Sequence, residues 1–464
     1  MLAGRRRIYM VFLFLLLLGM LRWLPLQAQS DCTITLGNGK PPLEVDPSVG
    51  PGTCGFLQFS WQAFFAMNWP ALAFDPPNAS KQARGLPDPA RIIGQTANGD
   101  NETVWEQYQP NWYLFAPNNP PPSTVNGESF AAWNQDAALP AACGPRQLAP
   151  GTKMLSALSK FDAMPGVTQA TGQPLLDQEG HYARYEIRLS YETFNYINKN
   201  QFYRKSAQTP TTIFDFPTQA GDAPGAIFVK AAWKVLSQAE RDSQRFHTAN
   251  AWMFTPGAPN SNVESTCVGP VPVGLVGLHI VQKTVNFPMQ IWATFEQIDN
   301  APADPANPNT QPHWSFFNAQ SNKPKNQKPQ CPTTPTTPCN DWQPTSTHLD
   351  DATGGPTQAE RITPIPRSQN QPALDQINAS AHAALRQVNP KSVWQFYRLV
   401  EAQWQKAGTS TGFFPPTHVA NLTMETYSQA NSCMNCHKNA KGTNNVLSDM
   451  SFELRLAWDP VVLP

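Results

Sequence analysis

Residues 271–284, VPVGLVGLHIVQKT, decide the fold because apolar side chains occupy both odd and even positions of this stretch. Successive side chains of a strand point to opposite faces of the sheet. The pattern therefore predicts a strand that is buried on both faces in the centre of a sheet. His279 interrupts the apolar stretch, where a buried imidazole needs a partner. Gly274 and Gly277 lie within the strand and indicate close packing.

Four other segments have the composition and spacing of antiparallel strands. In one of them Lys230 and Lys234 alternate with apolar residues, which predicts a solvated face. We therefore expect an α+β fold with a β-rich, sandwich-like antiparallel body. These four strands are predicted at residues 183–191, 226–236, 244–254 and 290–298.

Helices are expected at both ends of this body. Residues 54–70 are too densely aromatic for one amphipathic stripe and predict a buried helix. Residues 373–388 have a helical composition. Asn389 and Pro390 are a suitable N-cap and first-turn pair for a further helix that runs to about Lys406.

The chain is predicted to divide into four parts. Prolines recur every few residues beyond the strands, and periodicity is lost there. The predicted parts are a signal peptide (1–28), the β-rich body (29–300), a Pro-rich irregular excursion (301–371) and a helical C-terminal region (372–464).

Composition excludes wholesale disorder and a polyanion-binding surface. The 464 residues are 41% hydrophobic and include 14 Trp and 25 Phe, enough for a large core. There are 33 basic and 33 acidic residues, and charged residues make up only 14% of the chain. We expect no nucleic-acid partner.

The first segment indicates export. Three arginines, Arg5 to Arg7, precede an apolar run over residues 8–21, and the small residue Ala28 follows. The run is shorter than the roughly 20 residues that span a bilayer. We expect cleavage after Ala28 and a periplasmic protein of a Gram-negative bacterium, with membrane attachment only if the signal stays uncleaved.

Six of the eight cysteines are expected to form disulfides in that oxidising compartment. Fifteen connectivities are possible for six cysteines. Cys331 and Cys339 enclose a Pro/Thr stretch and are the strongest candidates for a local bridge. Pairing of neighbours then joins Cys32 to Cys54 and Cys143 to Cys267. The alternative is that one or two of the six are buried thiols.

The remaining cysteines carry the chemistry. Cys433-Met434-Asn435-Cys436-His437 matches the attachment motif of haem c, in which two thiols bind the haem covalently and the histidine ligates iron. The alternative is a disulfide between Cys433 and Cys436 beside a histidine with no ligand role. We expect one covalent haem held by Cys433, Cys436 and His437.

Four segments resemble a poorly characterised group of exported bacterial proteins, the cytochrome c family proteins. The group has one haem and a C-x-x-C-H motif near the C-terminus. The resemblance implies a covalent haem, a periplasmic location and electron transfer or haem binding, but no substrate. The segments are FSWQAFFAMNWP (59–70), GLVGLHIVQKTVNFPMQIWATFEQIDN (274–300), ETYSQANSCMNCHKNA (425–440) and SDMSFELRLA (448–457).

The tail that follows His437 is too short to wrap the haem, so the groups that cover its other face are expected to come from the β-rich body. Met424 and Met450 are further candidates for the sixth iron ligand, but both are expected to be core residues. His279 is expected near the haem as a ligand, a distal donor or a neighbour of a ligand; the alternative is a hydrogen-bonded core histidine far from iron. The other upstream candidates are His247, His382 and His418.

Three functions remain open. The first is a monohaem c-type cytochrome that transfers electrons to a redox partner protein. The second is a haem-dependent oxidoreductase, similar to a peroxidase or an oxygenase, with an apolar distal pocket and with His279 and Glu296 as acid/base candidates. The third is a module that senses a ligand or docks a partner through its Pro-rich surface.

Overall fold

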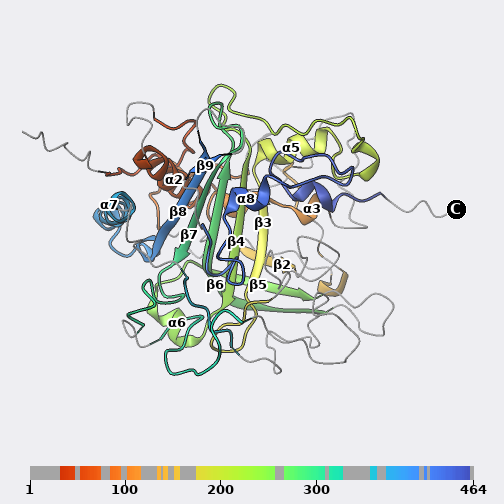
Figure 1. The fold of residues 1–464 in the computed structure, drawn as a ribbon. Coiled ribbons are helices and arrows are strands. Elements are labelled where there is room, and N and C mark those ends of the chain that lie inside the picture. The colour runs from red at the N-terminus through yellow and green to blue at the C-terminus, as the bar shows by residue number, and fades with distance from the viewer. Residues whose placement is uncertain are drawn as a thin grey trace, which may run out of the picture.

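A nine-stranded sheet forms the centre of the structure (Figure 1). The computed structural model confirms the α+β, β-rich class that the alternating segments predict. It describes residues 32–46, 53–74, 84–95, 102–115, 133–136, 139, 141–144, 151–156, 174–255, 266–308, 313–327, 356–362, 372–406, 412–414 and 419–459.

The strand order is β1-β3-β4-β6-β7-β8-β9, and β5 pairs with both β6 and β2. All pairs are antiparallel except β2 with β5. β6 contacts three strands, so the stretch quoted first is central, as predicted. The strands are β1 (Gln109–Pro110), β2 (Thr152–Ser156), β3 (Arg184–Leu189), β4 (Ile227–Val235), β5 (Thr248–Thr255), β6 (Thr266–Gln282), β7 (Ile291–Gln297), β8 (Tyr397–Gln405) and β9 (Phe413–Phe414).

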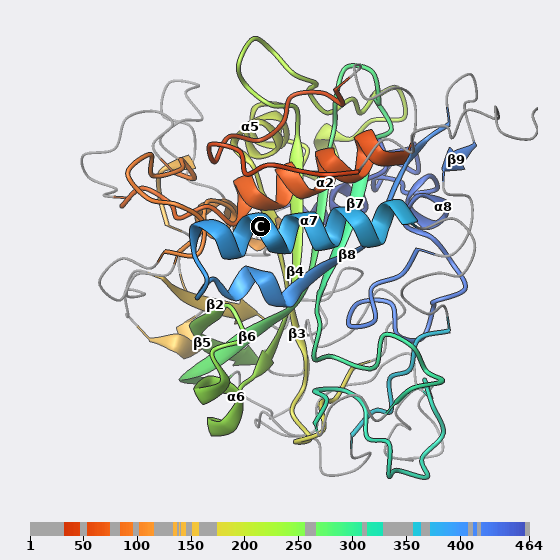
Figure 2. The same cartoon turned by 90° about the vertical axis from the view of Figure 1, so that its left-hand side faces the viewer.

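Helices cover one face of the sheet. α2 (Thr53–Met67) and α7 (Pro372–Val388) lie side by side on it (Figure 2). Trp61 and Phe64 of α2 reach Phe295 of β7, with ring centroids 5.1 and 4.4 Å apart. The described strands belong to one sheet, so these helices supply the layer that a second sheet would supply in a sandwich.

The opposite face of the sheet receives the C-terminal segment. Lys230 of β4, His279 of β6 and Thr294 of β7 are cross-strand neighbours on this face. Gly277 allows the segment to come close, because a Cβ at this position would lie 2.3 Å from Thr423 Oγ1. Asn421 then bonds to the backbone of β7, donating from Nδ2 to Phe295 O over 2.8 Å.

Two sequence predictions about the strands are wrong. The helix expected from Pro390 to about Lys406 is instead a short 3-10 helix, η8 (Val393–Phe396), followed by strand β8. Pairing with β7 overrides the local helical pattern, so the C-terminal region contributes strands as well as helices. Lys234 is 1% exposed and ion-paired, so the face that it shares with Lys230 is not solvated.

The remaining described elements are short. They are α3 (Trp112–Phe115), α5 (Tyr191–Lys199), α6 (Gln238–Ser243) and α8 (Cys433–His437), with 3-10 helices η3 (Trp105–Gln107), η5 (Ala141–Cys143), η6 (Lys205–Ala207) and η9 (Glu453–Leu456). The described parts of the Pro-rich excursion contain no helix or strand, as expected.

Two disulfides join the described segments. Cys32 bonds to Cys54 and Cys143 to Cys267, as pairing of neighbours predicts. The predicted bridge between Cys331 and Cys339 and the signal peptide lie outside the described residues. Such bridges are typical of an oxidising compartment and are compatible with export. Among the described helices, none has the length and apolar character needed to cross a membrane.

Candidate functional site

The C-x-x-C-H motif forms α8, one short helix held against the sheet. Met434 is fully buried, and its backbone N–H donates to Gln403 Oε1 of β8 over 2.8 Å. Cys433 is partly buried and Cys436 is exposed; they are two thiols, not a disulfide. Met434 belongs to one buried cluster with Trp292 and Val281, so this burial and the hydrogen bond to Gln403 hold the turn that carries both sulfurs.

His437 is oriented by a backbone carbonyl. Its Nδ1 donates to Met450 O over 2.7 Å. The ring also packs against Trp292 and Phe452, with centroid distances of 4.3 and 5.0 Å. Because a carbonyl only accepts, Nδ1 carries a proton, and in the neutral imidazole Nε2 then has the lone pair that a metal needs.

The turn that supplies this carbonyl has a strained backbone. Asp449 and Met450 have φ angles of 50° and 67°, in the left-handed region that costs most residues energy. Asp449 Oδ2 accepts from Lys283 Nζ over 2.7 Å and from the N–H of Phe216 over 2.8 Å. These contacts join the turn to the sheet and hold Met450 O in place for His437.

A cavity of about 290 Å³ lies between α8, the C-terminal segment and the sheet. Both cysteines of the motif and His437 line it, and so do His279 and Met450. Its walls are mostly apolar. The other apolar lining residues are Ile187, Phe228, Val229, Val281, Trp292, Val419 and Phe452.

His279 has an acidic partner at this cavity. Its Nε2 lies 3.2 Å from Glu425 Oε1, and the side chains are 13% and 22% exposed. Burial would raise the pKa of Glu425, but the charge and hydrogen bond of His279, with Lys230 and the N–H of Asn421, hold that pKa below its ordinary value. Glu425 is therefore a carboxylate at neutral pH, and it orients the imidazole.

Lys230 and Glu453 are two further charged residues of the cavity wall. Burial lowers the pKa of Lys230, and Glu425, Glu453 and Cys433 oppose that shift. Glu453 is 4% exposed and accepts from Asn111 Nδ2 over 2.7 Å. The cavity thus combines apolar walls with two histidines, one lysine and two carboxylates.

Most other residues considered from the sequence lie away from the cavity. Met424 is a core residue, as expected. His382 Nε2 donates to Tyr397 O on the helix-covered face, and His247 pairs with Glu106 in the core. Glu296 forms a buried ion pair with Arg361 and does not line the cavity with His279. His418 lies outside the described residues.

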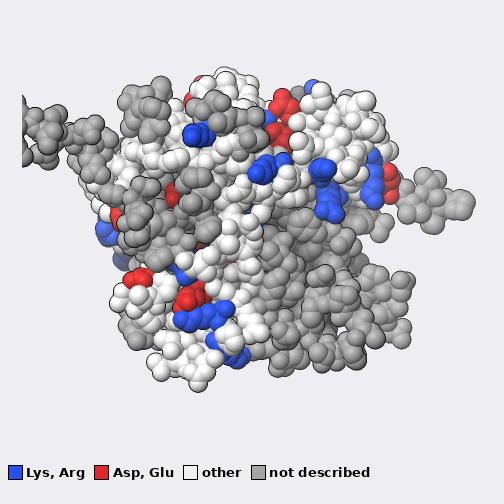
Figure 3. All heavy atoms as spheres, in the orientation of Figure 1, with Lys and Arg blue, Asp and Glu red and all other residues white. Residues whose placement is uncertain are grey.

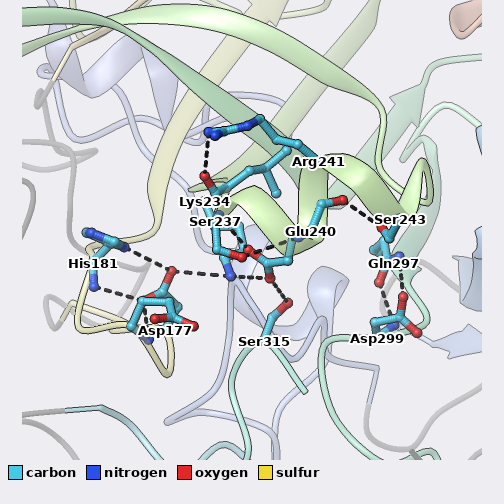
Figure 4. Close-up of polar contacts among 12 residues, drawn as sticks. Asp177, His181, Lys234, Ser237, Glu240, Arg241, Ser243, Gln297, Asp299 and Ser315 are labelled. Atoms are coloured by element: carbon cyan, nitrogen blue, oxygen red, sulfur yellow. Dashed lines mark hydrogen bonds and ion pairs between the residues drawn. The ribbon is translucent and has the colours of Figure 1, made fainter. Parts of the chain in front are cut away.

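A second group of buried charges is structural (Figure 4). Lys234 Nζ lies 2.5 Å from Glu240 Oε1 and 3.4 Å from Asp177 Oδ2. Glu240 also accepts from Ser315 Oγ over 3.3 Å. The group joins β4, α6 and two irregular segments, and none of its residues lines the cavity.

No known protein family, curated protein or solved structure matches this chain. The resemblance to cytochrome c family proteins therefore stays a prediction.

The residues around the cavity fit a covalently attached haem. Two thiols lie one helical turn apart, an imidazole donates from Nδ1 to a carbonyl, and aromatic side chains pack on that imidazole. In the described part of the chain, no group of three or more His, Cys, Asp or Glu side chains has the arrangement of a metal site.

Sequence reasoning missed Lys230, Glu425 and Glu453. The alternation around Lys230 predicts solvent, and Glu425 and Glu453 lie in segments with no strong periodicity. The one signal in the sequence was a polar residue within an apolar strand, and that signal identified His279 only.

Proposed function

We propose that the protein is an exported monohaem c-type cytochrome that binds one haem and transfers electrons in the periplasm. Cys433 and Cys436 would hold the haem through thioether bonds, and His437 would ligate its iron. The observation that carries the proposal is the hydrogen bond from His437 Nδ1 to Met450 O at the wall of a cavity that both cysteines line. Once attached, the haem supplies one-electron redox chemistry.

The protein's own residues would prepare this site in three ways. Met434 anchors the attachment turn, so both sulfurs are presented from a fixed position. The Met450 carbonyl sets the imidazole and raises its basicity as a ligand. Trp292 and Phe452 pack on the ring and exclude water from it, and a less polar surrounding changes the redox potential.

Replacement of His437 tests this assignment. In His437→Ala the cysteines remain, so covalent attachment should persist while the absorption spectrum and the midpoint potential change. His313→Ala is the control, because this exposed residue does not line the cavity. An unchanged Soret band in His437→Ala would refute the role of His437 as a ligand.

A haem-dependent oxidoreductase is the second candidate. The pair of His279 and Glu425 favours it, because His279 Nε2 can share a proton with Glu425 Oε1 at the cavity wall. Lys230 and Glu453 add charge where a simple electron carrier needs none.

Absorption spectra distinguish the two candidates. A six-coordinate, low-spin spectrum in the parent that is no longer low-spin in His279→Ala would make His279 the sixth ligand and favour the electron carrier. A high-spin spectrum that changes with CO or peroxide, with a response weakened in Glu425→Gln, would favour the oxidoreductase. Glu360→Gln is the matched control, since Glu360 lies outside the cavity.

A further inference from the structure

A second hollow borders the cavity at Phe452. Its volume is about 520 Å³, and Lys205, Lys441 and Arg455 line it together with Phe452 and polar residues. Phe452 also lines the first cavity, and its ring centroid lies 5.0 Å from that of His437. One aromatic side chain therefore separates this hollow from the proposed haem ligand.

The three cationic residues come from separate segments. Lys205 begins η6, Lys441 follows α8 and Arg455 belongs to η9. All three residues are exposed, and none of the described residues that line the hollow is acidic. The chain as a whole has 33 basic and 33 acidic residues, so this excess of positive charge is local.

A buried glutamine holds these segments together. Gln208 Oε1 accepts from the N–H of Thr443 over 2.8 Å, and its Nε2 donates to Leu454 O over 2.8 Å. Gly442 leaves room for this side chain, because a Cβ there would lie 2.5 Å from Gln208 Oε1. The cations are therefore mounted on a connected scaffold, which keeps like charges near one another.

The carboxylate of Asp459 lies near Lys205 and offsets part of the positive charge. Asp459 accepts from the N–H and Oγ of Ser206 over 3.1 and 2.8 Å. These hydrogen bonds lower the pKa of Asp459, and Lys205 and Arg204 lower it further. Figure 3 shows several separate Lys and Arg side chains on this face, around α8 and the C-terminal segment, with acidic side chains beside some of them.

We propose that the hollow formed by Lys205, Lys441 and Arg455 docks an acidic surface of the protein that exchanges electrons with the haem. This inference rests on the proposed function. One electron would pass between the partner and the haem, so that one is oxidised as the other is reduced and no bond forms or breaks. Because Phe452 lines both the hollow and the cavity, a partner docked in the hollow would lie close to the His437 side of the cavity.

The exposure of Lys205, Lys441 and Arg455 favours a protein partner over a tightly bound small anion. Ion pairs in water are each worth little, so three exposed cations bind a single free anion weakly. The same charges speed the encounter with a complementary surface and orient it. Transient complexes of redox proteins use small interfaces of this kind.

The test uses the holoprotein and charged redox reagents. Lys205, Lys441 and Arg455 are changed together to Gln, and oxidation of the reduced protein by anionic ferricyanide is followed by stopped flow at low ionic strength. The matched control changes three exposed lysines outside the hollow, Lys40, Lys323 and Lys391, to Gln and so removes the same net charge.

We expect about a tenfold fall in the ferricyanide rate for the hollow variant, with a weaker salt dependence, and little change in the control. Oxidation by the cationic tris(phenanthroline)cobalt(III) should become faster in the hollow variant. Equal effects in both triple variants, or no effect in either, would overturn the docking site.

A titration that needs no haem provides the second readout. A hexaglutamate peptide should give a calorimetric binding signal at low salt with the parent and the control, and none with the hollow variant. Equal binding to all three proteins would also overturn the inference. Haem staining separates this failure from failure of the proposed function, because a chain without covalent haem refutes the function whatever the peptide does.

Discussion

Asp449 should control both the stability of the protein and the setting of His437. Its Oδ2 pairs with Lys283 over 2.7 Å and with the N–H of Phe216 over 2.8 Å, and its neighbour Met450 supplies the carbonyl for His437. In Asp449→Ala, Lys283, which is 2% exposed, keeps only Asp215, which is 77% exposed. The substitution therefore removes the more buried of the two ion pairs of Lys283.

The expected loss in the free energy of unfolding is about 2.5–4 kcal/mol, the sum of two contributions. A hydrogen bond to a charged group contributes about 1.5–3 kcal/mol. Alanine at a φ of 50° adds about 1 kcal/mol, because it tolerates the left-handed region less well than aspartate. Displacement of Met450 O should also change the absorption spectrum and midpoint potential of the haem-loaded protein.

Two variants act as controls for Asp449→Ala. Asp449→Asn keeps an acceptor oxygen and tolerates positive φ, so it should restore the spectrum and most of the stability. Asp215→Asn removes the exposed partner of Lys283 and should cost less than about 1 kcal/mol. Urea unfolding followed by tryptophan fluorescence gives the free energies. An Asp449→Ala protein as stable as Asp215→Asn, with the parent's spectrum, would refute the role of this turn.

Three further predictions concern the rest of the fold. The pKa of Glu106 lies far below its ordinary 4.5, because Lys153 and His247 outweigh the effect of burial. Its contribution to stability is therefore present above about pH 4.5 and is lost as the pH falls. Glu106→Gln should be less stable at pH 7, and its free energy of unfolding, measured by urea titration, should fall less steeply in acid. Removal of the bridge between Cys143 and Cys267, 124 residues apart, should cost about 5 kcal/mol in the same assay, and a loss under 1 kcal/mol would contradict the loop-closure argument. Gly277→Ala should cost about 1–3 kcal/mol, because its Cβ would meet Thr423 at 2.3 Å, and wild-type stability would show that residues 421–425 do not pack there.

Local sequence predicted the centre of the fold but not its edge. The apolar stretch of β6 carries its own signal, since a strand buried on both faces needs apolar residues at every position. Residues 393–404 fit a helical face equally well, and only pairing with β7, about a hundred residues earlier, makes them η8 and β8. Long-range pairing of this kind has no local signature.

The residues of the site also divide into those that the local sequence identifies and those that only the fold reveals. Cys433, Cys436 and His437 form a contiguous motif, so spacing alone identifies them. His279 stood out because it interrupts an apolar strand, and the structure brings it to the same cavity as the motif. Glu425 comes from a turn 146 residues further along the chain, so only the folded arrangement reveals it as the partner of His279.

The mass of the protein after extraction in acidified organic solvent tests the central proposal most directly. Thioether bonds survive this treatment, whereas haem that is only ligated leaves the polypeptide. We predict a polypeptide mass increased by one haem, and loss of that increase when Cys433 and Cys436 are both changed to Ala. A parent protein whose mass equals that of the polypeptide alone would contradict the assignment of this chain as a c-type cytochrome.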